Sequence, residues 1–580
     1  GFCRYLEQSF SDLTERGVVI GYDARAHPPS GGSSKRFARL AAAVFISRGV
    51  PVHLFSEITP TPFNPKTVSL VQDLVKEGAV EALKKCFSSR MEFGTAGLRA
   101  AMGPGVSCMN DLTIIQTTQP FTVSHLGLCA GIMVTASHNP KQDNGYKVYW
   151  DNGAQIVSPH DSGISKAIEE NLEPWPESWN TEEALKTPLL KDPYQEMNAQ
   201  YFKAIQKHCH HELNKNSQVK IVHTSVHGVG HTFVQSAFKA FDLHPPYAVE
   251  EQKDPDPEFP TVKYPNPEEG EGVLTLSFAL AEREGASVVL ANDPDADRLA
   301  IAEKQEGQWR VFSGNELGAL LGWWLFHCWR EQNADTAAVK NLYMLSSTVS
   351  SKILRAIALK EGFHFEETLT GFKWMGNRAK DLLDQGKSVL FAFEEAIYMC
   401  CNAVLDKDGV SAAAIAGEMI SYLATKNKSL SQQLTTIFEY GYHISKNSYF
   451  ICHDQEVIRG LFDRLRRFGD KKDTYPSECG RFSISAVRDL TTGYDSNQPD
   501  HKAILPTSSS SQMITFTFSN GGVATMRTSG TEPKIKYYTE LCAAPGNDVT
   551  HLKKELDDLV DAIVENFFEP EKNRLQPKPE

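Results

Sequence analysis

The stretch that decides the fold is Ser287–Arg298, which reads SVVLANDPDADR. Its first half is an apolar, β-branched run of the kind that forms a buried strand, and its second half is an acidic, turn-forming loop. In parallel sheets, ligands bind just beyond the carboxyl ends of strands. The stretch therefore predicts an α/β fold with a functional loop at Asn292–Arg298.

The same pattern recurs along most of the chain. Helical patterns such as Lys35–Arg48, Ser350–Lys360 and Ala412–Thr425 separate further apolar runs, and strands alternating with helices predict parallel sheets covered on both faces. Polar clusters follow several of these runs, so we expect several α/β units to present their loops to one cleft. The other predicted buried strands are Val18–Tyr22, Val50–Phe55, Gly131–Thr135, Val219–Val226, Leu342–Ser346 and Val389–Phe393.

The pattern changes after about residue 440, where strands follow one another without intervening helices. One strong helix is predicted at Leu552–Phe568, with its apolar residues on one face. This order predicts a C-terminal α+β domain. Its strands are predicted at Ser448–Cys452, Phe482–Val487, Met513–Phe518 and Gly522–Met526.

Composition narrows the class of protein. The chain has 580 residues, which predicts three to five domains, and its 41% hydrophobic and 23% charged residues are typical of a globular protein. The net charge of −13 argues against nucleic acid or an anionic membrane as the main partner. The eleven cysteines contain no CxxC pair, which predicts a reducing, cytosolic compartment. The most apolar stretch, Leu317–Trp329, is too short to span a membrane.

The acidic loop carries three carboxylates at alternate positions, Asp293, Asp295 and Asp297, which can converge on one cation. Mg²⁺ prefers oxygen ligands and keeps open positions for water or phosphate oxygen. An EF-hand also begins D-x-D-x-D, but Arg298 stands where the glycine is required and Lys304 where the glutamate is required. The plainer interpretation is a solvated acidic turn, and the position after a strand favours the metal site over it.

A second strand ends in TASHNP at residues 135–140, which places Ser137 at the strand tip. No G-x-S-x-G elbow is present, so a hydrolase nucleophile has no support. A serine beside a metal can instead carry a phosphoryl group, because the cation neutralises charge on the transferred group. Taken alone, these residues favour an ordinary turn. The nearby Lys147 could stabilise phosphate or move a proton.

Two small hydroxyl-rich loops contain a glycine and an arginine: GTAGLR at residues 94–99 and RTSGT at residues 527–531. Backbone amides, hydroxyls and a guanidinium form a phosphate-binding set. Either loop alone is equally well explained as a turn, and two in one chain favour a doubly phosphorylated ligand. Thr370–Lys373 and Phe393–Glu395 supply an amine and carboxylates suited to sugar hydroxyls, although a buried structural ion pair would also explain them.

Together, TASHNP…NGYK, NDPDADR, GFK, EEA…DKDG and RTSGTEPK resemble the motif set of the α-D-phosphohexomutase superfamily. GTAGLRAAMGPG, NPKQDNGYKVYWDNGAQI and RTSGTEPKIKYY look like its eukaryotic phosphopentomutase branch. The resemblance implies four domains in a heart-shaped arrangement, three related α/β domains with mixed sheets and a C-terminal α+β domain. The implied domains are 1–205 (phosphoserine), 206–311 (magnesium-binding), 312–440 (sugar-binding) and 441–580 (phosphate-binding).

The resemblance also implies roles for individual residues. Ser137 would carry the phosphoryl group, Arg99 and Arg298 would lie beside it, and Lys147 would act in proton transfer. The implied ligands of Mg²⁺ are Ser137, Asp293, Asp295 and Asp297. Ten residues are implied to bind substrate: His138, Thr370, Gly371, Lys373, Glu394, Lys407, Arg527, Ser529, Gly530 and Thr531.

The implied reaction interconverts ribose or deoxyribose 1- and 5-phosphates, and glucose 1- and 6-phosphates, through a phosphoserine and a sugar bisphosphate intermediate. Glucose 1,6-bisphosphate or ribose 1,5-bisphosphate is the implied activator. We expect a cytoplasmic monomer whose partners are sugar phosphates, with no nucleic acid and no membrane. Two alternatives remain open: a glucose 1,6-bisphosphate synthase and a non-catalytic sugar-phosphate sensor. The retention of Ser137 and of all three aspartates argues against the sensor.

Two features depart from the family pattern. The third-domain loop usually reads like G-E-x-S-x-G, whereas here Ala396 replaces the serine and no glycine precedes Tyr398. In the family, the loop like GTAGLR also precedes the segment like VVIGYDARAHPPSGG, whereas here it follows that segment. Joining Gln119 to Gly1 would restore one continuous amphipathic helix. We therefore hypothesise that the block 64–119 belongs before residue 1.

Overall fold

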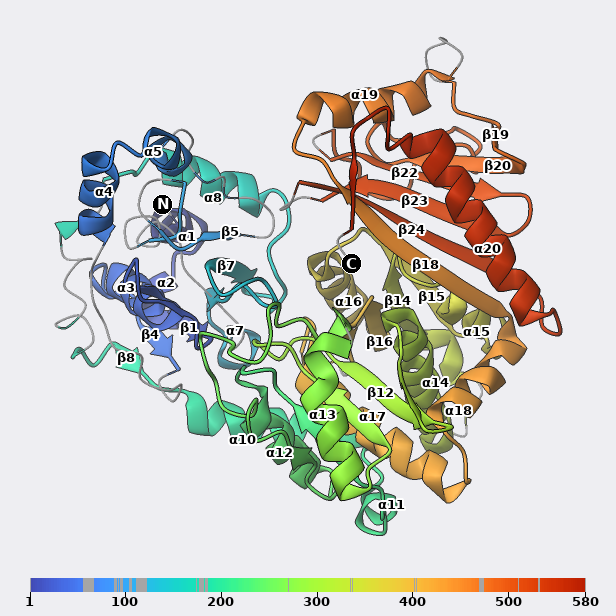
Figure 1. Cartoon of the computed structure of the whole chain (residues 1–580). Coiled ribbons are helices and arrows are strands. Elements are labelled where there is room, and N and C mark those ends of the chain that lie inside the picture. Colours follow the sequence, from blue (N-terminus) through green and yellow to red (C-terminus); the bar gives the residue numbers. More distant parts are fainter. Residues whose placement is uncertain are drawn as a thin grey trace. The chain divides into compact units, whose positions relative to one another are not determined.

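Figure 1 shows the chain as a computed structural model, which divides into two compact units. The first unit comprises Gly1–Leu317, Trp324–Ala334 and Gly371–Leu430, and the second comprises Gly318–Trp323, Asp335–Thr370 and Ser431–Glu580. No described helix is long and apolar enough to cross a membrane. The structure describes residues 2–55, 67–87, 91, 93, 97–103, 107–110, 123–173, 175–176, 182, 186–269, 271–333, 335, 337–400, 402, 404–468, 474–509, 511–529 and 533–578.

The first sheet of the first unit has six strands in the order β5-β7-β6-β1-β4-β8. β1 pairs in parallel with β4 and β6, and β7 is antiparallel to both β6 and β5. Helix α3 (Ser34–Ile46) packs on β1 and buries nine of its residues, so this sheet has a covered face and a buried core. The strands are β5 (Leu98–Ala101), β7 (Asp143–Trp150), β6 (Ala130–Val134), β1 (Val18–Tyr22), β4 (Val52–Leu54) and β8 (Leu190–Lys191).

The second sheet of the same unit has five strands in the order β10-β9-β11-β12-β13. β9 pairs in parallel with β10 and β11, and β12 is antiparallel to β11 and β13. Every residue of β11 is buried, as its uninterrupted apolar sequence predicts. Helix α13 (Glu271–Glu284) packs on β9 and β11. The strands are β10 (Tyr247–Ala248), β9 (Ile221–Thr224), β11 (Val288–Ala291), β12 (Ala300–Gln305) and β13 (Gln308–Val311).

Both sheets are mixed, as the resemblance implied. Each combines parallel strands with an antiparallel return, and the α/β class with mixed sheets is confirmed. The returning strands β7 and β12 follow the two polar loops directly. Each loop is therefore fixed at both ends, by the strand that enters it and by the strand that leaves it.

A hairpin of β16 (Ser388–Glu394) and β17 (Ile397–Met399) also belongs to the first unit. Its turn places Glu395 at a φ of +49°, and the carbonyl of Ala396 accepts a hydrogen bond from Leu299 N–H at 3.2 Å. The shortened loop therefore packs against the segment that follows the acidic loop. Helix α17 (Gly409–Thr425) follows, and Asp408 caps it by accepting from the N–H groups of Val410 and Ser411.

The second unit contains an antiparallel sheet in the order β19-β20-β22-β23-β24-β18-β25, with β21 (Tyr494–Asp495) beside β20. Helix α20 (Val549–Ile563) buries its apolar face against this sheet, which confirms the α+β prediction. The unit also holds helix α19 (Gln455–Arg466) and the parallel pair β14 (Leu342–Ser347) and β15 (His364–Thr368). The main strands are β19 (Glu478–Cys479), β20 (Phe482–Asp489), β22 (Met513–Phe518), β23 (Gly522–Thr528), β24 (Lys534–Ala543), β18 (Tyr442–Ile451) and β25 (Gln576–Pro577).

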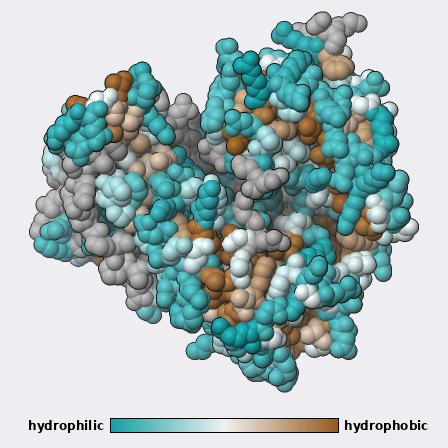
Figure 2. All heavy atoms as spheres, viewed as in Figure 1, coloured by the Kyte–Doolittle hydropathy of each residue, from teal (hydrophilic) through white to brown (hydrophobic). Residues whose placement is uncertain are grey.

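The hypothesis on the block 64–119 falls on Gln119 and Gly1, which lie outside the described residues. Within the block, β5 pairs antiparallel with β7 at the edge of the first sheet. Hydrophilic side chains cover most of the described surface on the face shown in Figure 2, as the net charge of −13 leads one to expect.

Candidate active site

The acidic loop follows β11, and one carboxylate oxygen from each of Asp293, Asp295 and Asp297 lies within 4.8 Å of the other two. The N–H of Arg298 donates to Asp293 Oδ1 at 3.0 Å and closes the loop on itself. Neighbouring backbone also packs directly on it, because a Cβ built at Gly228 would lie 2.3 Å from the Cα of Pro294. The loop is therefore held in one conformation by close packing.

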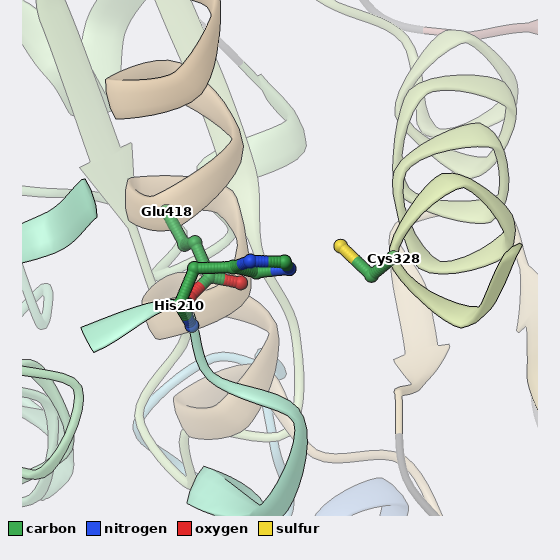
Figure 3. A group of neighbouring side chains, drawn as sticks. All are labelled: His210, Cys328 and Glu418. Carbon is green, nitrogen blue, oxygen red and sulfur yellow. Dashed lines mark hydrogen bonds between the residues drawn. The ribbon is translucent and has the colours of Figure 1, made fainter. Parts of the chain in front are cut away.

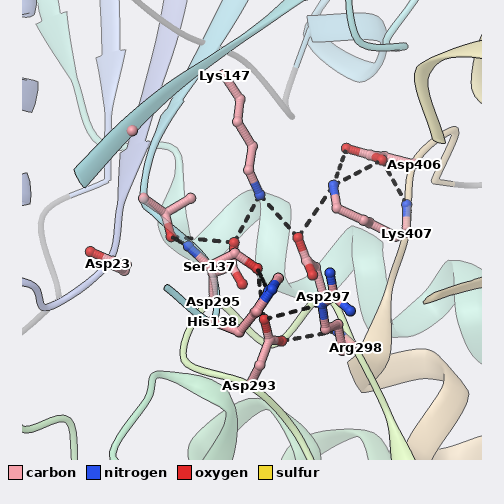
Figure 4. Close-up of polar contacts among 12 residues, drawn as sticks. Asp23, Ser137, His138, Lys147, Asp293, Asp295, Asp297, Arg298, Asp406 and Lys407 are labelled. Atoms are coloured by element: carbon pink, nitrogen blue, oxygen red, sulfur yellow. Dashed lines mark hydrogen bonds and ion pairs between the residues drawn. The ribbon is translucent and has the colours of Figure 1, made fainter. Parts of the chain in front are cut away.

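Two lysines neutralise part of this negative charge, as Figure 4 shows. Lys147 Nζ on β7 lies 2.9 Å from Asp295 and 3.0 Å from Asp297, and Lys407 Nζ lies 3.2 Å from Asp297. Burial alone would lower the pKa of Lys147, but the two carboxylates outweigh it, so the pKa is raised and the amine carries its proton. Burial would raise the pKa of Asp297, and the two lysines lower it instead.

Ser137 lies at the end of β6 and is 4% exposed. Its hydroxyl donates to Asp293 Oδ2 at 2.8 Å, so the serine from the first sheet touches the acidic loop of the second. The residue has a φ of +54°, a left-handed conformation that is uncommon for a non-glycine residue and clusters at functional sites. His138 Nδ1 lies 3.3 Å from the same hydroxyl, which places the predicted His138 in the site.

The buried ion pair of Asp23 and Arg25 supports the backbone of the Ser137 loop. This pair was not among the site residues predicted from the sequence. Arg25 is 2% exposed, pairs with Asp23 at 3.0 Å and donates to the carbonyl of Ser137. It also donates to the carbonyls of Asn139 and Pro140, both at 3.1 Å. The signal was the polar sequence YDAR directly after β1, whose carboxyl end lies beside that of β6.

The two predicted arginines differ in their contacts. Arg99 on β5 donates to Asn139 Oδ1 at 3.3 Å and so reaches the serine loop. The guanidinium of Arg298 instead forms an ion pair with Glu268, and its Nε lies 3.9 Å from Asp293. Burial would lower the pKa of Arg298, but Glu268 and Asp293 outweigh it and raise it. Arg298 therefore carries its positive charge beside the acidic loop.

The predicted sugar-binding residues of the first unit form a second cluster. Glu394 Oε2 accepts the N–H of Gly371 at 2.7 Å, which joins the two predicted segments. Burial lowers the pKa of Lys373 to about 8, because Asp161 and Glu394 only partly offset the lost solvation. Lys407 belongs instead to the acidic cluster described above, together with Asp406, which lies 3.3 Å from its Nζ.

The remaining predicted substrate residues belong to the second unit, which is described by itself. Thr370 ends one segment of that unit. Arg527 on β23 donates to the hydroxyl of Tyr538 at 3.1 Å, and Ser529 N–H donates to the carbonyl of Lys534 at 2.9 Å. Gly530 and Thr531 lie outside the described residues.

The acidic loop fits a hard divalent cation. Asp295 Oδ1 and Asp297 Oδ1 are buried and, within the described part of the chain, accept no hydrogen bond. Burial and the neighbouring carboxylates raise the pKa of Asp293 well above its usual range. A cation bound to these oxygens would satisfy them and relieve that repulsion, and an all-oxygen donor set suits Mg²⁺.

His223 lies in β9 and serves packing and hydrogen bonding. His223 is 1% exposed, and its Nε2 lies 2.9 Å from Asn292 Oδ1. Burial lowers the pKa of His223 to about 4, so its ring is neutral. Asn292 in turn donates to the carbonyls of Arg298 and Gly409. The histidine therefore supports the acidic loop without entering it.

Comparison with known proteins identifies relatives over the whole chain. Family models for phosphoglucomutase/phosphomannomutase α/β/α domains I, II and III match residues 1–70 with 117–175, 199–307 and 313–440, respectively. A Homo sapiens protein named phosphopentomutase is 67% identical over 583 residues, covering 100% of this chain and 86% of that protein. A Homo sapiens protein named glucose 1,6-bisphosphate synthase is 54% identical over 580 residues, covering 99% and 84%.

The fold also matches a solved structure. A phosphoglucomutase/phosphomannomutase family protein from Burkholderia thailandensis superposes with a TM-score of 0.54 at 16% identity, covering 97% of this chain and 93% of that chain. The resemblance read from the motifs is thereby confirmed. The chain belongs to the α-D-phosphohexomutase superfamily, within its phosphopentomutase branch.

Proposed function

We propose that the chain is a phosphosugar mutase that interconverts ribose or deoxyribose 1- and 5-phosphates and, as a second substrate pair, glucose 1- and 6-phosphates. The observation that carries the proposal is the contact of Ser137 Oγ with Asp293 at 2.8 Å, in a cluster that also contains Asp295, Asp297 and the charged Lys147. A nucleophilic hydroxyl, a cation site and a fixed positive charge are the parts that phosphoryl transfer needs.

In the proposed cycle, the phosphoryl group on Ser137 Oγ passes to a free hydroxyl of the sugar monophosphate. The P–Oγ bond breaks and a P–O bond to the sugar forms, which leaves a sugar bisphosphate. This bisphosphate reorients and returns its other phosphoryl group to Ser137. Mg²⁺ held by Asp293, Asp295 and Asp297, and by the group on Ser137, would supply charge neutralisation for the transferred group.

Lys147 is proposed to handle the proton. Its raised pKa means that the amine is protonated in the described arrangement, so it can donate a proton to Ser137 Oγ as the phosphoryl group leaves. The attacking sugar hydroxyl loses one proton in the same step, and the amine can take it up, so the lysine ends the transfer protonated again. Arg99 and Arg298 are proposed to stabilise the phosphoserine. The residues proposed to bind the sugar are His138, Thr370, Gly371, Lys373, Glu394 and Lys407. The residues proposed to hold the distal phosphate are Arg527, Ser529, Gly530 and Thr531.

The proposal extends to the working conditions of the enzyme. Glucose 1,6-bisphosphate or ribose 1,5-bisphosphate would prime Ser137 when its phosphate has been lost. The protein would act as a monomer in the cytoplasm, on small sugar phosphates and without nucleic acid or membrane partners. The ten cysteines that the structure describes are all free thiols, which supports a reducing compartment.

A second candidate is a glucose 1,6-bisphosphate synthase, because a relative of that name is 54% identical over 99% of the chain. Such an enzyme would use the same serine and cation but take its phosphoryl group from an acyl phosphate. The higher identity of 67% to the protein named phosphopentomutase favours the mutase.

The experiment compares the wild-type protein, Ser137→Ala and the control Ser162→Ala, whose serine is exposed at the start of helix α8 (His160–Glu169). We expect Ser137→Ala to lower the conversion of ribose 1-phosphate to ribose 5-phosphate at least about a thousandfold, because removing a nucleophile removes the covalent path. The control should retain wild-type activity. Mass spectrometry should locate one phosphate on the wild-type Ser137 peptide after incubation with glucose 1,6-bisphosphate.

Undiminished turnover by Ser137→Ala would overturn the phosphoserine mechanism. A faster synthesis of glucose 1,6-bisphosphate from glucose 1-phosphate and 1,3-bisphosphoglycerate than turnover of ribose 1-phosphate would replace the mutase by the synthase. Intact binding of sugar phosphates with neither activity in the wild-type protein would support the sensor.

A further inference from the structure

A second group of potential metal ligands lies in the first unit, apart from the acidic loop. One ligand atom from each of His210, Cys328 and Glu418 lies within 4.8 Å of the other two. The three residues come from three elements: the segment before α11 (His211–Lys215), α14 (Gly314–Gln332) and α17. Figure 3 shows the thiol of Cys328 pointing toward the His210 ring, with the Glu418 carboxylate beside that ring.

Two of the three residues are buried, His210 is partly buried, and their polar atoms are incompletely satisfied. Cys328 is 3% exposed and Glu418 is 2% exposed. Glu418 Oε2 accepts from His210 N–H at 2.6 Å and from Asn214 Nδ2 at 2.9 Å. Both donors are neutral amides, and the structure gives Glu418 no lysine or arginine partner within the residues it describes. Burying a carboxylate without a countercharge is costly, so the cluster is short of one positive charge.

The side chain of His210 is a second indication that a cation is bound here. His210 Nε2 is buried and has no hydrogen-bond partner within the described residues. A buried imidazole nitrogen without a hydrogen-bond partner has an unsatisfied lone pair or N–H, and a bound metal ion would satisfy it. Asn214 Oδ1 is likewise buried without a partner at the edge of the cluster.

We propose that His210, Cys328 and Glu418 bind one Zn²⁺ ion in a structural site. Nitrogen, sulfur and oxygen donors together select zinc over the hard cations that prefer an all-oxygen site. A thiolate and a carboxylate would balance the charge of Zn²⁺, so the loaded site would be neutral and suited to burial. Zinc–ligand bonds of about 2.0–2.3 Å require ligand atoms roughly 3.5 Å apart, and the three ligand atoms lie within 4.8 Å of one another.

The site would be independent of the proposed catalytic cation. Glu418 lies nine residues after Gly409, about 14 Å along α17 from the end that packs against the acidic loop. The role of the site would be to tie the segment before α11 and α14 to α17.

The test uses full-length protein stripped of metal with a chelator and then titrated with Co²⁺ in excess Mg²⁺. Cobalt bound to a thiolate absorbs in the near ultraviolet by charge transfer, and the aspartate cluster contains no sulfur, so the band cannot come from that cluster. The Cys328→Ser variant then distinguishes the proposed site from the other thiols. We expect about one equivalent of Co²⁺ to produce the band and Zn²⁺ to abolish it. Elemental analysis after dialysis against Zn²⁺ and Mg²⁺ should find about one zinc per chain.

The matched variants are Cys328→Ser and Cys479→Ser, because Cys479 is equally buried, at 1% exposed, but lies in the second unit. Cys328→Ser should lose the band and bind Zn²⁺ at least about tenfold more weakly, whereas Cys479→Ser should match the wild type. Glu418→Gln should keep the band at weaker affinity, so it tests the site without removing sulfur. A wild-type protein without the band, or a band of equal strength in folded Cys328→Ser, would overturn the proposal.

Discussion

Lys373 is the proposed site residue whose charge changes closest to neutral pH. Its pKa of about 8 means that the amine is charged below pH 8 and neutral above it. If the ammonium binds the sugar phosphate, KM should be constant from about pH 6.5 to 7.5 and rise up to about tenfold per pH unit above 8. Steady-state kinetics with ribose 1-phosphate across this range measures the effect.

Two variants isolate the contribution of Lys373. Lys373→Arg should remove the rise in KM at high pH, because a guanidinium stays charged throughout the range. Lys380→Arg on the same helix, α16 (Phe372–Asp384), should leave the wild-type profile unchanged, because Lys380 pairs with Asp384 at the surface. A profile for Lys373→Arg that still rises above pH 8 would assign the titration to another group.

Sequence reasoning identified the residues whose chemistry is distinctive in the local sequence. Ser137 and the three aspartates each follow a strand within a short motif, and the structure brings them together. Arg25 was missed because its role depends on a parallel pairing between β1 and β6, which are far apart in the sequence. The pairing of Arg298 with Glu268 was missed for the same reason, since it joins residues 30 positions apart.

Among the elements, α17 connects the acidic loop to the interior through its capped N-terminus. Asp408 is 8% exposed and accepts from two backbone N–H groups and from the hydroxyl of Tyr201. We expect Asp408→Ala to lower the free energy of unfolding by about 1–2 kcal/mol and to reduce kcat as well, because Lys407 next to the cap touches Asp297. Urea denaturation and steady-state kinetics measure the two effects.

A second helix cap provides the control. Asp454 caps α19 in the second unit through the N–H groups of Glu456 and Val457, in an exposed position. Asp454→Ala should cost about 0.5–1 kcal/mol and leave kcat unchanged. Equal effects of the two variants on kcat would show that the α17 cap has no special connection to the site.

The strands that could be predicted are those whose local sequence has a clear pattern of apolar residues bounded by polar ones. β1 and β22 are found at their predicted bounds, because each is an apolar run closed by polar residues. β7 and β12 were missed as strands: β7 contains the polar motif NGYK, and β12 is a short run that continues into the charged residues Glu303 and Lys304. Their antiparallel pairing depends on partners that local sequence does not specify.

At the scale of the whole molecule, the proposed cation is bound by one unit only. Mg²⁺ at about a hundred times its Kd should stabilise that unit by about 2.7 kcal/mol, because it binds the folded state alone. Amide hydrogen exchange should therefore slow in peptides from β9, β11 and β12. Peptides from β22 and β23 should exchange at unchanged rates. Asp295→Asn, which removes one ligand charge, should abolish the slowing, and equal slowing in both units would contradict the assignment.

Length and motif order predicted the number and class of the domains, and the family matches agree with the α/β class of the first three. The boundaries 1–205, 206–311, 312–440 and 441–580 stay predictions, as does the heart-shaped arrangement. Residues of the predicted third domain belong to both compact units. A compact unit is defined by contacts between elements, and the periodicity of the sequence does not predict those contacts. The net charge described only the surface average, and Lys147 and Lys407 lie buried among carboxylates.

The left-handed backbone conformation of Ser137 matters for directed evolution of this protein toward higher thermal stability. Glycine adopts that conformation without strain, so a Ser137→Gly substitution would relax the loop while deleting the hydroxyl. A selection that rewards only thermal survival would therefore favour the loss of the proposed phosphate carrier. At this residue, activity and stability therefore favour different side chains. A library screen has to measure turnover at every round to keep Ser137.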